Sequence, residues 1–155
     1  MIRLLLFLTL LFLKTDSGIH FKISYQIDEK SQMLLSGKTN LQGYQCSCND
    51  KFPPAVLEAE INPANGSIRF SNAGLLVRTK QLDCHDFIVT HYMHKSLLAE
   101  KFPYIQVQFV TAQPLHTDKL LAIGKVYNYS VTTVITLAGV SRTHVLPVQL
   151  TRLNK

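Results

Sequence analysis

The sequence predicts an all-β protein, an antiparallel barrel or sandwich of about eight strands with one helix inserted between them. Apolar and polar residues alternate with period two along many short segments, as in half-buried strands. These segments are separated by turns rich in Gly, Pro and Asn, at intervals of roughly 8–15 residues. The segment from Asp83 to Lys101 lacks the alternation and contains helical spacing instead.

Length and composition predict one folded domain. The chain has 155 residues, of which 46% are hydrophobic and 17% are charged, and this balance excludes disordered and collagen-like classes. A chain of about 150 residues buries roughly two thirds of its unfolded surface, so it can build a core of its own.

Residues 1–18 are expected to be a secretory signal peptide. Arg3 supplies a positive charge, Leu4–Leu13 is an apolar run, and Ser17 and Gly18 are small residues suited to cleavage. An apolar run of this length is about half of the roughly 20 residues that span a bilayer. We therefore expect a domain over residues 19–155, in a periplasmic or extracellular location.

The first half of that domain contains six segments with strand character, joined by turn-forming residues. Asp28–Ser31 is expected to be the first turn, and Asn65-Gly66 ends a later turn cluster of the kind that joins antiparallel strands. Gly37 lies within the second segment and predicts a bend or bulge there. The six segments are Phe21–Ile27, Met33–Leu41, Tyr44–Cys48, Val56–Ile61, Ile68–Phe70 and Leu75–Thr79.

A helix is predicted over His91–Glu100. Met93, Leu97 and Glu100 recur at helical spacing, and Thr90 is a suitable N-cap. Phe102-Pro103 is expected to end this region, because the residue before a proline disfavours helical backbone.

Four further strands are predicted after the helix. Ile105–Phe109 alternates cleanly, and Gly139 separates the final two strands. The four are Ile105–Phe109, Leu120–Val126, Val131–Leu137 and Thr143–Leu150.

The three cysteines favour one disulfide and one remaining thiol. In an oxidising compartment, Cys84 is expected to bond either Cys46 or Cys48, against the alternative of three unbonded thiols. Cys46 and Cys48 on an extended strand are at the edge of bridging range. Their Cys-x-Cys spacing does not match the usual zinc-binding pattern, so no metal site is expected from them.

The histidines and serines form no strong catalytic or metal-binding motif. His85, His91 and His94 lie close together in sequence, and Asp83 or Asp86 offers a further ligand, but solvated helix histidines are the favoured interpretation. No Gly-x-Ser-x-Gly elbow occurs, and we expect no enzyme activity and no catalytic residue.

The chain is basic, with 16 Lys plus Arg against 10 Asp plus Glu and a net charge of +6. Removal of residues 1–18 lowers this charge to +5. The cations are spread from Lys22 to Lys155, and neither a basic run nor an aromatic stacking pattern indicates nucleic acid. The charge is compatible with contact to an anionic membrane surface. No pattern defines an oligomeric state.

Several motifs occur in an order that resembles a known family. Gly37-Lys-Thr39-Asn40 leads to Tyr44-Gln-Cys46, and Leu82-Asp83-Cys84 precedes the helical segment. Glu100-Lys-Phe-Pro-Tyr-Ile105 enters the next strand, and Leu137-Ala-Gly-Val140 follows near the end. Together these motifs, over roughly residues 20–150, resemble the YceI-like family of secreted, lipocalin-like barrels.

The resemblance implies an eight-stranded antiparallel barrel that holds a polyisoprenoid, such as a quinone tail, in its lumen. It implies lipid binding without catalysis and no other cofactor. Tyr44-Gln-Cys46 and Asp83-Cys84 match a cysteine-containing branch, so the resemblance favours a Cys46–Cys84 bond and leaves Cys48 without a partner.

The apolar faces of two strands are the expected lumen lining, and they fit a packed core equally well. The residues are Phe21, Ile23, Tyr25, Ile105, Val107 and Phe109. The expected function is that of an exported binding protein for an apolar, isoprenoid-like lipid. The alternative is a ligand-free structural or interaction module of the cell envelope.

Overall fold

The described part of the chain forms ten β-strands and one α-helix, which confirms the all-β class. The computed structural model describes residues 18–28, 30–38, 43–116 and 122–151, with Ile23 described through its backbone alone. The strands are β1 Ile19–Tyr25, β2 Leu34–Lys38, β3 Gly43–Cys48, β4 Ala55–Ile61, β5 Ile68–Asn72, β6 Gly74–Arg78, β7 Leu82–Asp83, β8 Tyr104–Pro114, β9 Val126–Leu137 and β10 Val140–Thr151. The helices are α1 Phe87–Ser96 and the 3-10 turn η2 Thr79–Gln81.

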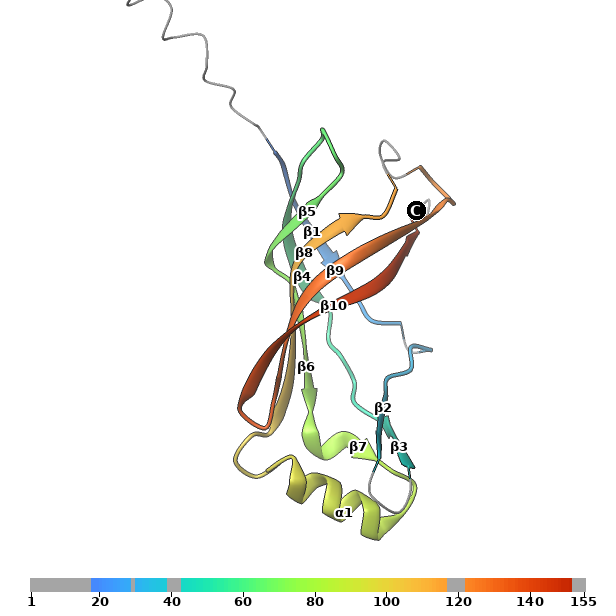
Figure 1. The fold of residues 1–155 in the computed structure, drawn as a ribbon, viewed down its shortest axis with the longest axis vertical. Helices are drawn as coiled ribbons and strands as arrows, with labels where there is room; N and C mark the ends of the chain where they lie inside the picture. The colour runs from blue at the N-terminus through green and yellow to red at the C-terminus, as the bar shows by residue number, and fades with distance from the viewer. Residues whose placement is uncertain (1–17, 29, 39–42, 117–121, 152–155) are drawn as a thin grey trace, which may run out of the picture.

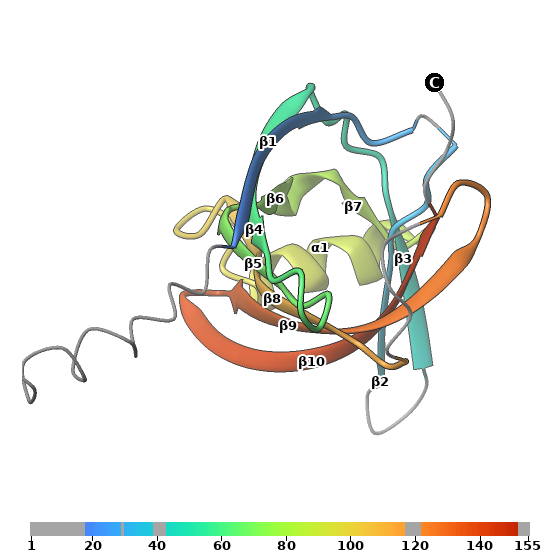
Figure 2. The ribbon, with the colours of Figure 1, turned by 90° about the horizontal axis from the view of Figure 1, so that it is seen from above.

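The strands form two antiparallel sheets. The larger follows the order β1-β4-β5-β8-β9-β10, with β6 also paired to β8, and the smaller follows β2-β3-β7. Figure 2, seen from above, shows the strands arranged as a ring with α1 lying across it. No ladder joins the two sheets among the described strands, so a closed lipocalin-like barrel is not observed in the hydrogen bonding.

The larger sheet divides where β5 passes into β6. Both strands pair with β8 in the same direction, and the buried residue Ala73 lies between them. β4 pairs with β5 only as far as the Glu58–Asn72 position, so Ala55–Leu57 of β4 separates from Gly74–Leu76 of β6. We call these two separated stretches the fork.

Glycine is required where β6 approaches β8. A Cβ added to Gly74 would lie 2.8 Å from the carbonyl oxygen of Val107, well inside normal contact. Gly37, by contrast, causes no bulge: it pairs in register with Tyr44, whose ring occupies the space that a Cβ would need. The predicted bend at Gly37 is therefore wrong, and the glycine is explained by packing under an aromatic ring.

The core consists of two apolar clusters. The first surrounds the helix and the smaller sheet, and its buried members are Cys46, Val77, Leu82, Cys84, Met93, Leu97 and Ile105. The second consists of residues from strands β4, β5, β8 and β9 of the larger sheet. Its buried members are Ala59, Ile68, Ala112, Tyr127, Tyr129 and Val131. Figure 1 shows α1 at one end of the molecule and the β4–β5 turn at the other.

A disulfide and a polar contact attach the smaller sheet to the rest of the molecule. Cys46 of β3 is bonded to Cys84, which precedes α1, and both are buried. This is the pairing favoured by the family resemblance. The amide of Asn49 donates to the carbonyl of Gln81 at 2.9 Å. Cys48 retains a thiol and is half-buried.

The helix begins and ends earlier than predicted. Asp86, and not Thr90, is the N-cap: its carboxylate accepts a hydrogen bond of 2.9 Å from the Val89 amide. The Thr90 hydroxyl instead accepts from the Cys84 amide at 3.0 Å. The pattern between 91 and 100 missed the first turn because exposed Phe87 and Ile88 conceal the boundary.

The predicted strand Leu120–Val126 is wrong where it is described. Residues 120 and 121 lie outside the described part of the chain, and the stretch from Ala122 to Lys125 has only an isolated β-bridge at Ile123 and a turn at Gly124, whose φ is 77°. Val126 instead begins the long strand β9, which includes the predicted strand Val131–Leu137. The residues of the predicted signal peptide also lie outside the described ranges, apart from Gly18. Within those ranges, no helix is long and apolar enough to cross a membrane.

Candidate functional site

The fork encloses a hollow of about 400 Å³. Its walls are the separated ends of β4 and β6, and β8 contributes its floor. The apolar residues that line it are Ala55, Val56, Ala73, Leu75, Leu76 and Val107, and the polar ones are Tyr25, Ser71, Asn72, Gln106 and Gln108, with Gly74 between them.

Tyr25 spans the fork from β1. Its hydroxyl donates a hydrogen bond of 2.6 Å to the carbonyl of Gly74, across the gap left where β4 and β6 are not paired. The contact leaves the phenol oxygen at the edge of the hollow, where its lone pairs can accept from a ligand.

Much of the lining of the hollow lies outside the two core clusters. Leu75 packs against the first cluster, whereas Val56, Leu76 and Val107 belong to neither cluster. Leu76 and Val56 are exposed at 57% and 39%, so part of the apolar wall faces solvent. An apolar ligand in this position would extend the core into the fork.

The six predicted lumen residues do not line one cavity. Tyr25 and Val107 line the fork hollow. Ile105 is 5% exposed in the first cluster, and Phe21 and Phe109 pack against the second. Phe109 also stacks at a tilt on Phe70, with ring centroids 6.1 Å apart. The side chain of Ile23 lies outside the described residues.

The fork residues of β4 and β6 were not among the predicted site residues. Val56, Leu75 and Leu76 were predicted only as strand positions. A signal was present in Ser71-Asn-Ala-Gly74, which interrupts two strand patterns with small residues. At these residues the chain continues in the same direction along β8, and only the neighbouring strand β4 leaves it.

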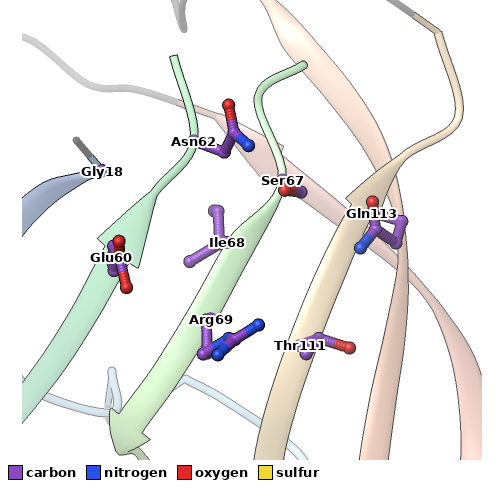
Figure 3. Close-up of a pocket in the computed structure, with 8 residues that line it drawn as sticks. All are labelled: Gly18, Glu60, Asn62, Ser67, Ile68, Arg69, Thr111 and Gln113. Atoms are coloured by element: carbon purple, nitrogen blue, oxygen red, sulfur yellow. The ribbon is translucent and has the colours of Figure 1, made fainter. Parts of the chain in front are cut away.

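A second hollow, of about 210 Å³, has polar walls and lies toward the other end of the large sheet. Figure 3 shows its side chains on adjacent strands: Glu60 from β4, Arg69 from β5, and Thr111 and Gln113 from β8. Glu60 and Arg69 are directly opposite in the strand register. Opposite charges in such a pair stabilise a sheet, and this lining does not suit an apolar ligand.

The residues near Cys84 contain one Ser–His contact but no catalytic triad in the described structure. The Ser47 hydroxyl lies 3.4 Å from Nε2 of His85. The Asp83 carboxylate accepts from the backbone amide of His85 at 2.9 Å, and this contact does not orient the imidazole ring. His85 has a φ of 58°, which the turn at the start of α1 requires.

The histidines that lie close together in sequence make separate contacts. Nε2 of His94 lies 2.9 Å from the carbonyl oxygen of Leu82, and His91 packs edge-on against the ring of Tyr92. In the described ranges, no three His, Cys, Asp or Glu side chains are placed to hold a metal ion.

Asp50, in the loop after β3, forms an ion pair with Arg78 of β6. Oδ1 of Asp50 accepts from Nη2 and Nε of Arg78 at 2.6 and 2.8 Å, and Oδ2 accepts from the Arg78 amide at 2.8 Å. Burial acts to raise the pKa of Asp50, but the hydrogen bonds and charge of Arg78 outweigh it and lower the pKa. In turn, the hydrogen bond from Asp50 raises the pKa of Arg78.

Comparison with protein-family models, with curated proteins and with solved structures finds no match to this chain. The resemblance to the YceI-like family therefore stays a prediction.

Proposed function

We propose that the protein binds an apolar, isoprenoid-like lipid, and that the fork hollow is the binding site. The observation that carries this proposal is the break in the core at the fork: Val56, Leu76 and Val107 belong to neither packed cluster and, beside polar side chains, line a hollow of about 400 Å³. Ligand pockets for small molecules commonly fall between about 300 and 1,000 Å³.

Burial of apolar surface would supply the affinity. Leu76 is 57% exposed in the free protein, and covering it removes apolar area from water at roughly 25 cal/mol per Å². The modest volume suits a short apolar segment, so we expect one end of a longer chain to enter the fork. Tyr25, Gln106 and Gln108 supply polar groups at its edge that can fix a head group.

The proposal extends to the setting of the protein. The disulfide between Cys46 and Cys84 is compatible with export to an oxidising periplasmic or extracellular compartment. We propose that the two sheets act as the walls of one lipocalin-like barrel of the YceI-like type, and that the protein binds without catalysing a reaction. The ring of strands in Figure 2 supports the barrel proposal.

Organic extraction and a pair of matched variants test the binding site. Mass spectrometry of an extract from natively purified protein should detect a polyprenyl lipid. Titration with a short prenol should show that Leu76→Ser weakens binding about ten-fold, because one apolar contact of roughly 1.5 kcal/mol is lost. Val140→Ser removes an equally exposed apolar side chain from β10 and should leave the affinity unchanged. Absence of lipid and of prenol binding would refute the proposal.

A ligand-free interaction module is the second candidate, and β10 favours it. Residues Val140–Pro147 are exposed on both faces of the strand, and β10 pairs only with β9 in the described sheet. Such an edge can pair with another chain, although Pro147 interrupts its hydrogen-bonding potential. Sedimentation analysis separates the two candidate functions. A stable complex with another chain, free of bound lipid and abolished by Val145→Lys, would favour the interaction module.

A further inference from the structure

The outward face of α1 carries large apolar side chains. Phe87, Ile88 and Tyr92 are 86%, 63% and 61% exposed. At 100° per residue these three positions fall on one side of the helix, together with His91 and Lys95. Exposed aromatic and aliphatic residues gathered in this way indicate a surface for interaction.

The opposite face of the same helix is already buried. Met93 is 6% exposed and belongs to the first core cluster, and Val89 packs against that cluster. A surface helix of a globular protein is ordinarily apolar on its core side and polar on the other, whereas a helix that is apolar on both sides is covered on both. The apolar composition of the outward face of α1 therefore indicates that another surface covers it.

The charge around this face is mainly positive. A hollow of about 560 Å³ lies beside the C-terminal part of α1, and it is lined by Lys80, His91, His94, Lys95, Leu98, Ala99, Glu100 and Lys101. Glu100 is the one acid in this lining, and it is paired with Lys80 at 2.7 Å. Asp86 lies at the helix N-terminus, where its carboxylate is occupied by the Val89 amide. Among the described residues Lys95 has no ion pair, and the ammonium of Lys101 lies 5.3 Å from the centroid of the Phe102 ring, so neither charge is neutralised by an acid.

The presence of leucine at position 98 indicates that this surface has a function beyond stabilising the fold. It occupies the position after the helix C-cap with a φ of 51°, in a Schellman motif closed by bonds from Leu98 to Lys95 and from Ala99 to His94. Glycine is strongly preferred there, because a leucine pays a steric cost in the left-handed region. Leu98 is nevertheless 49% exposed and lines the hollow, so its side chain contributes little to the core.

We propose that the α1 end of the molecule docks on an anionic lipid bilayer. In the docked state Phe87, Ile88 and Tyr92 lie at the level of the head groups and acyl chain boundary, and Lys95 and Lys101 face lipid phosphates. Aromatic residues and lysines are the side chains that favour this interface, and each lysine near an anionic surface contributes attraction that salt screens. Figure 1 shows that α1 forms one end of the molecule, away from the fork, so docking and ligand binding use separate surfaces.

Vesicle binding tests the docking surface directly. The whole chain is mixed with vesicles of phosphatidylcholine, with and without phosphatidylglycerol, and the bound fraction is measured by co-sedimentation at low and high salt. We expect binding to the anionic vesicles that falls as salt is raised. Equal binding to both vesicle types, or no binding to either, would overturn the proposal.

Matched variants assign the binding to α1. Ile88→Ser should lower the partition coefficient about ten-fold, whereas Val145→Ser, at 64% exposure on β10, should not change it. Lys95→Glu should have an effect of similar size, whereas Arg142→Glu, which changes an exposed cation on β10 opposite Ile135, should have little. The N-terminal residues are the same in every variant, so differences report on α1.

Leu98→Gly distinguishes docking from folding. It should raise the melting temperature by about 2–4 °C while it weakens vesicle binding, because the backbone is relieved and an apolar contact is lost. Vesicle binding that is unchanged by Ile88→Ser, or self-association that Ile88→Ser abolishes, would show that a membrane does not cover this face. Neither result would bear on prenol binding at the fork.

Discussion

Asp50 is a single carboxylate that connects the loop after β3 to β6 of the larger sheet. Its side chain is 3% exposed and accepts bonds from both the backbone and the guanidinium of Arg78 on β6. Since its pKa in the folded protein lies below the ordinary value of about 3.9, the ionised form stabilises the fold above that pH. This contribution is lost as the pH falls through the lowered pKa.

Asp50→Asn should therefore lower the free energy of unfolding at neutral pH by about 1–2 kcal/mol, because charged hydrogen bonds are replaced by weaker neutral ones. The difference between variant and parent should shrink as the pH falls below about 4, where the parent carboxylate becomes protonated. Urea unfolding at a series of pH values measures this. Glu100→Gln removes an exposed pair with Lys80 and should change little. Parallel pH curves for parent and Asp50→Asn would contradict the assignment.

Residue chemistry was partly predictable from the sequence. The residues alone left Cys46 and Cys48 open as partners of Cys84, and the resemblance to the YceI-like family favoured Cys46, which is the partner in the structure. The N-cap was wrongly placed at Thr90 because a threonine before helical spacing resembles a cap equally well. Asp86 prevails since its carboxylate reaches the Val89 amide one turn earlier. The Asp50–Arg78 pair joins positions 28 residues apart, and no local pattern indicates it.

In the turn of the β9–β10 hairpin, only one of the two central residues suits its backbone conformation. Leu137 pairs with Val140, so Ala138 and Gly139 form a two-residue turn with φ values of 49° and 79°. Two positive φ values define the turn that favours Asn-Gly, and alanine is strained at the first position. A Cβ on Gly139 would also lie 2.5 Å from the ring of Phe102.

Ala138→Asn should therefore stabilise the protein by about 0.5–1 kcal/mol, because asparagine tolerates the left-handed region. Gly139→Ala should destabilise it by more than about 1 kcal/mol, through strain and contact with Phe102. Both are measured as shifts in the urea midpoint at constant slope. Opposite signs for the two changes are the expected signature, and destabilisation by Ala138→Asn would disprove this account of the turn.

Most elements followed from period-two alternation, since strands with one buried face reveal it. β1, β4 and β8 begin and end within a few residues of the predicted segments, except that β8 continues to Pro114. β8 was underestimated because its register shifts between Phe109 and Thr111, which breaks the alternation in sequence. The fork was not predictable either: it depends on where β4 leaves β5, and pairing between separate strands leaves no periodic signal.

At the scale of the whole molecule, the Cys46–Cys84 bond holds the smaller sheet to the helix across a separation of 38 residues. Closing a loop of this length restricts the unfolded chain by about 4 kcal/mol in the chain-entropy model. Both sulfurs lie in the first core cluster, so the bond also fixes the packing of α1 against β3.

Replacing both cysteines, as Cys46→Ala with Cys84→Ala, should lower the free energy of unfolding by about 3–4 kcal/mol, and reductant should do the same to the parent. Cys48→Ser is the matched control: its thiol is unbonded and half-buried, so its effect should be much smaller. Thermal unfolding with and without reductant measures both. A parent protein whose stability does not respond to reductant would contradict the expectation.

The division of the large sheet has a consequence for how the molecule opens. Over the fork, β1 and β4 are bonded to each other, and within the described residues they reach β6 through one hydrogen bond, from Tyr25 to Gly74. A hairpin-like pair attached so weakly at one end is a local cooperative unit, whose opening free energy lies below that of the global core. Amide protons near Ala55–Leu57 should then exchange with solvent sooner than those of β9, so the two ends of β4 report different stabilities within one strand.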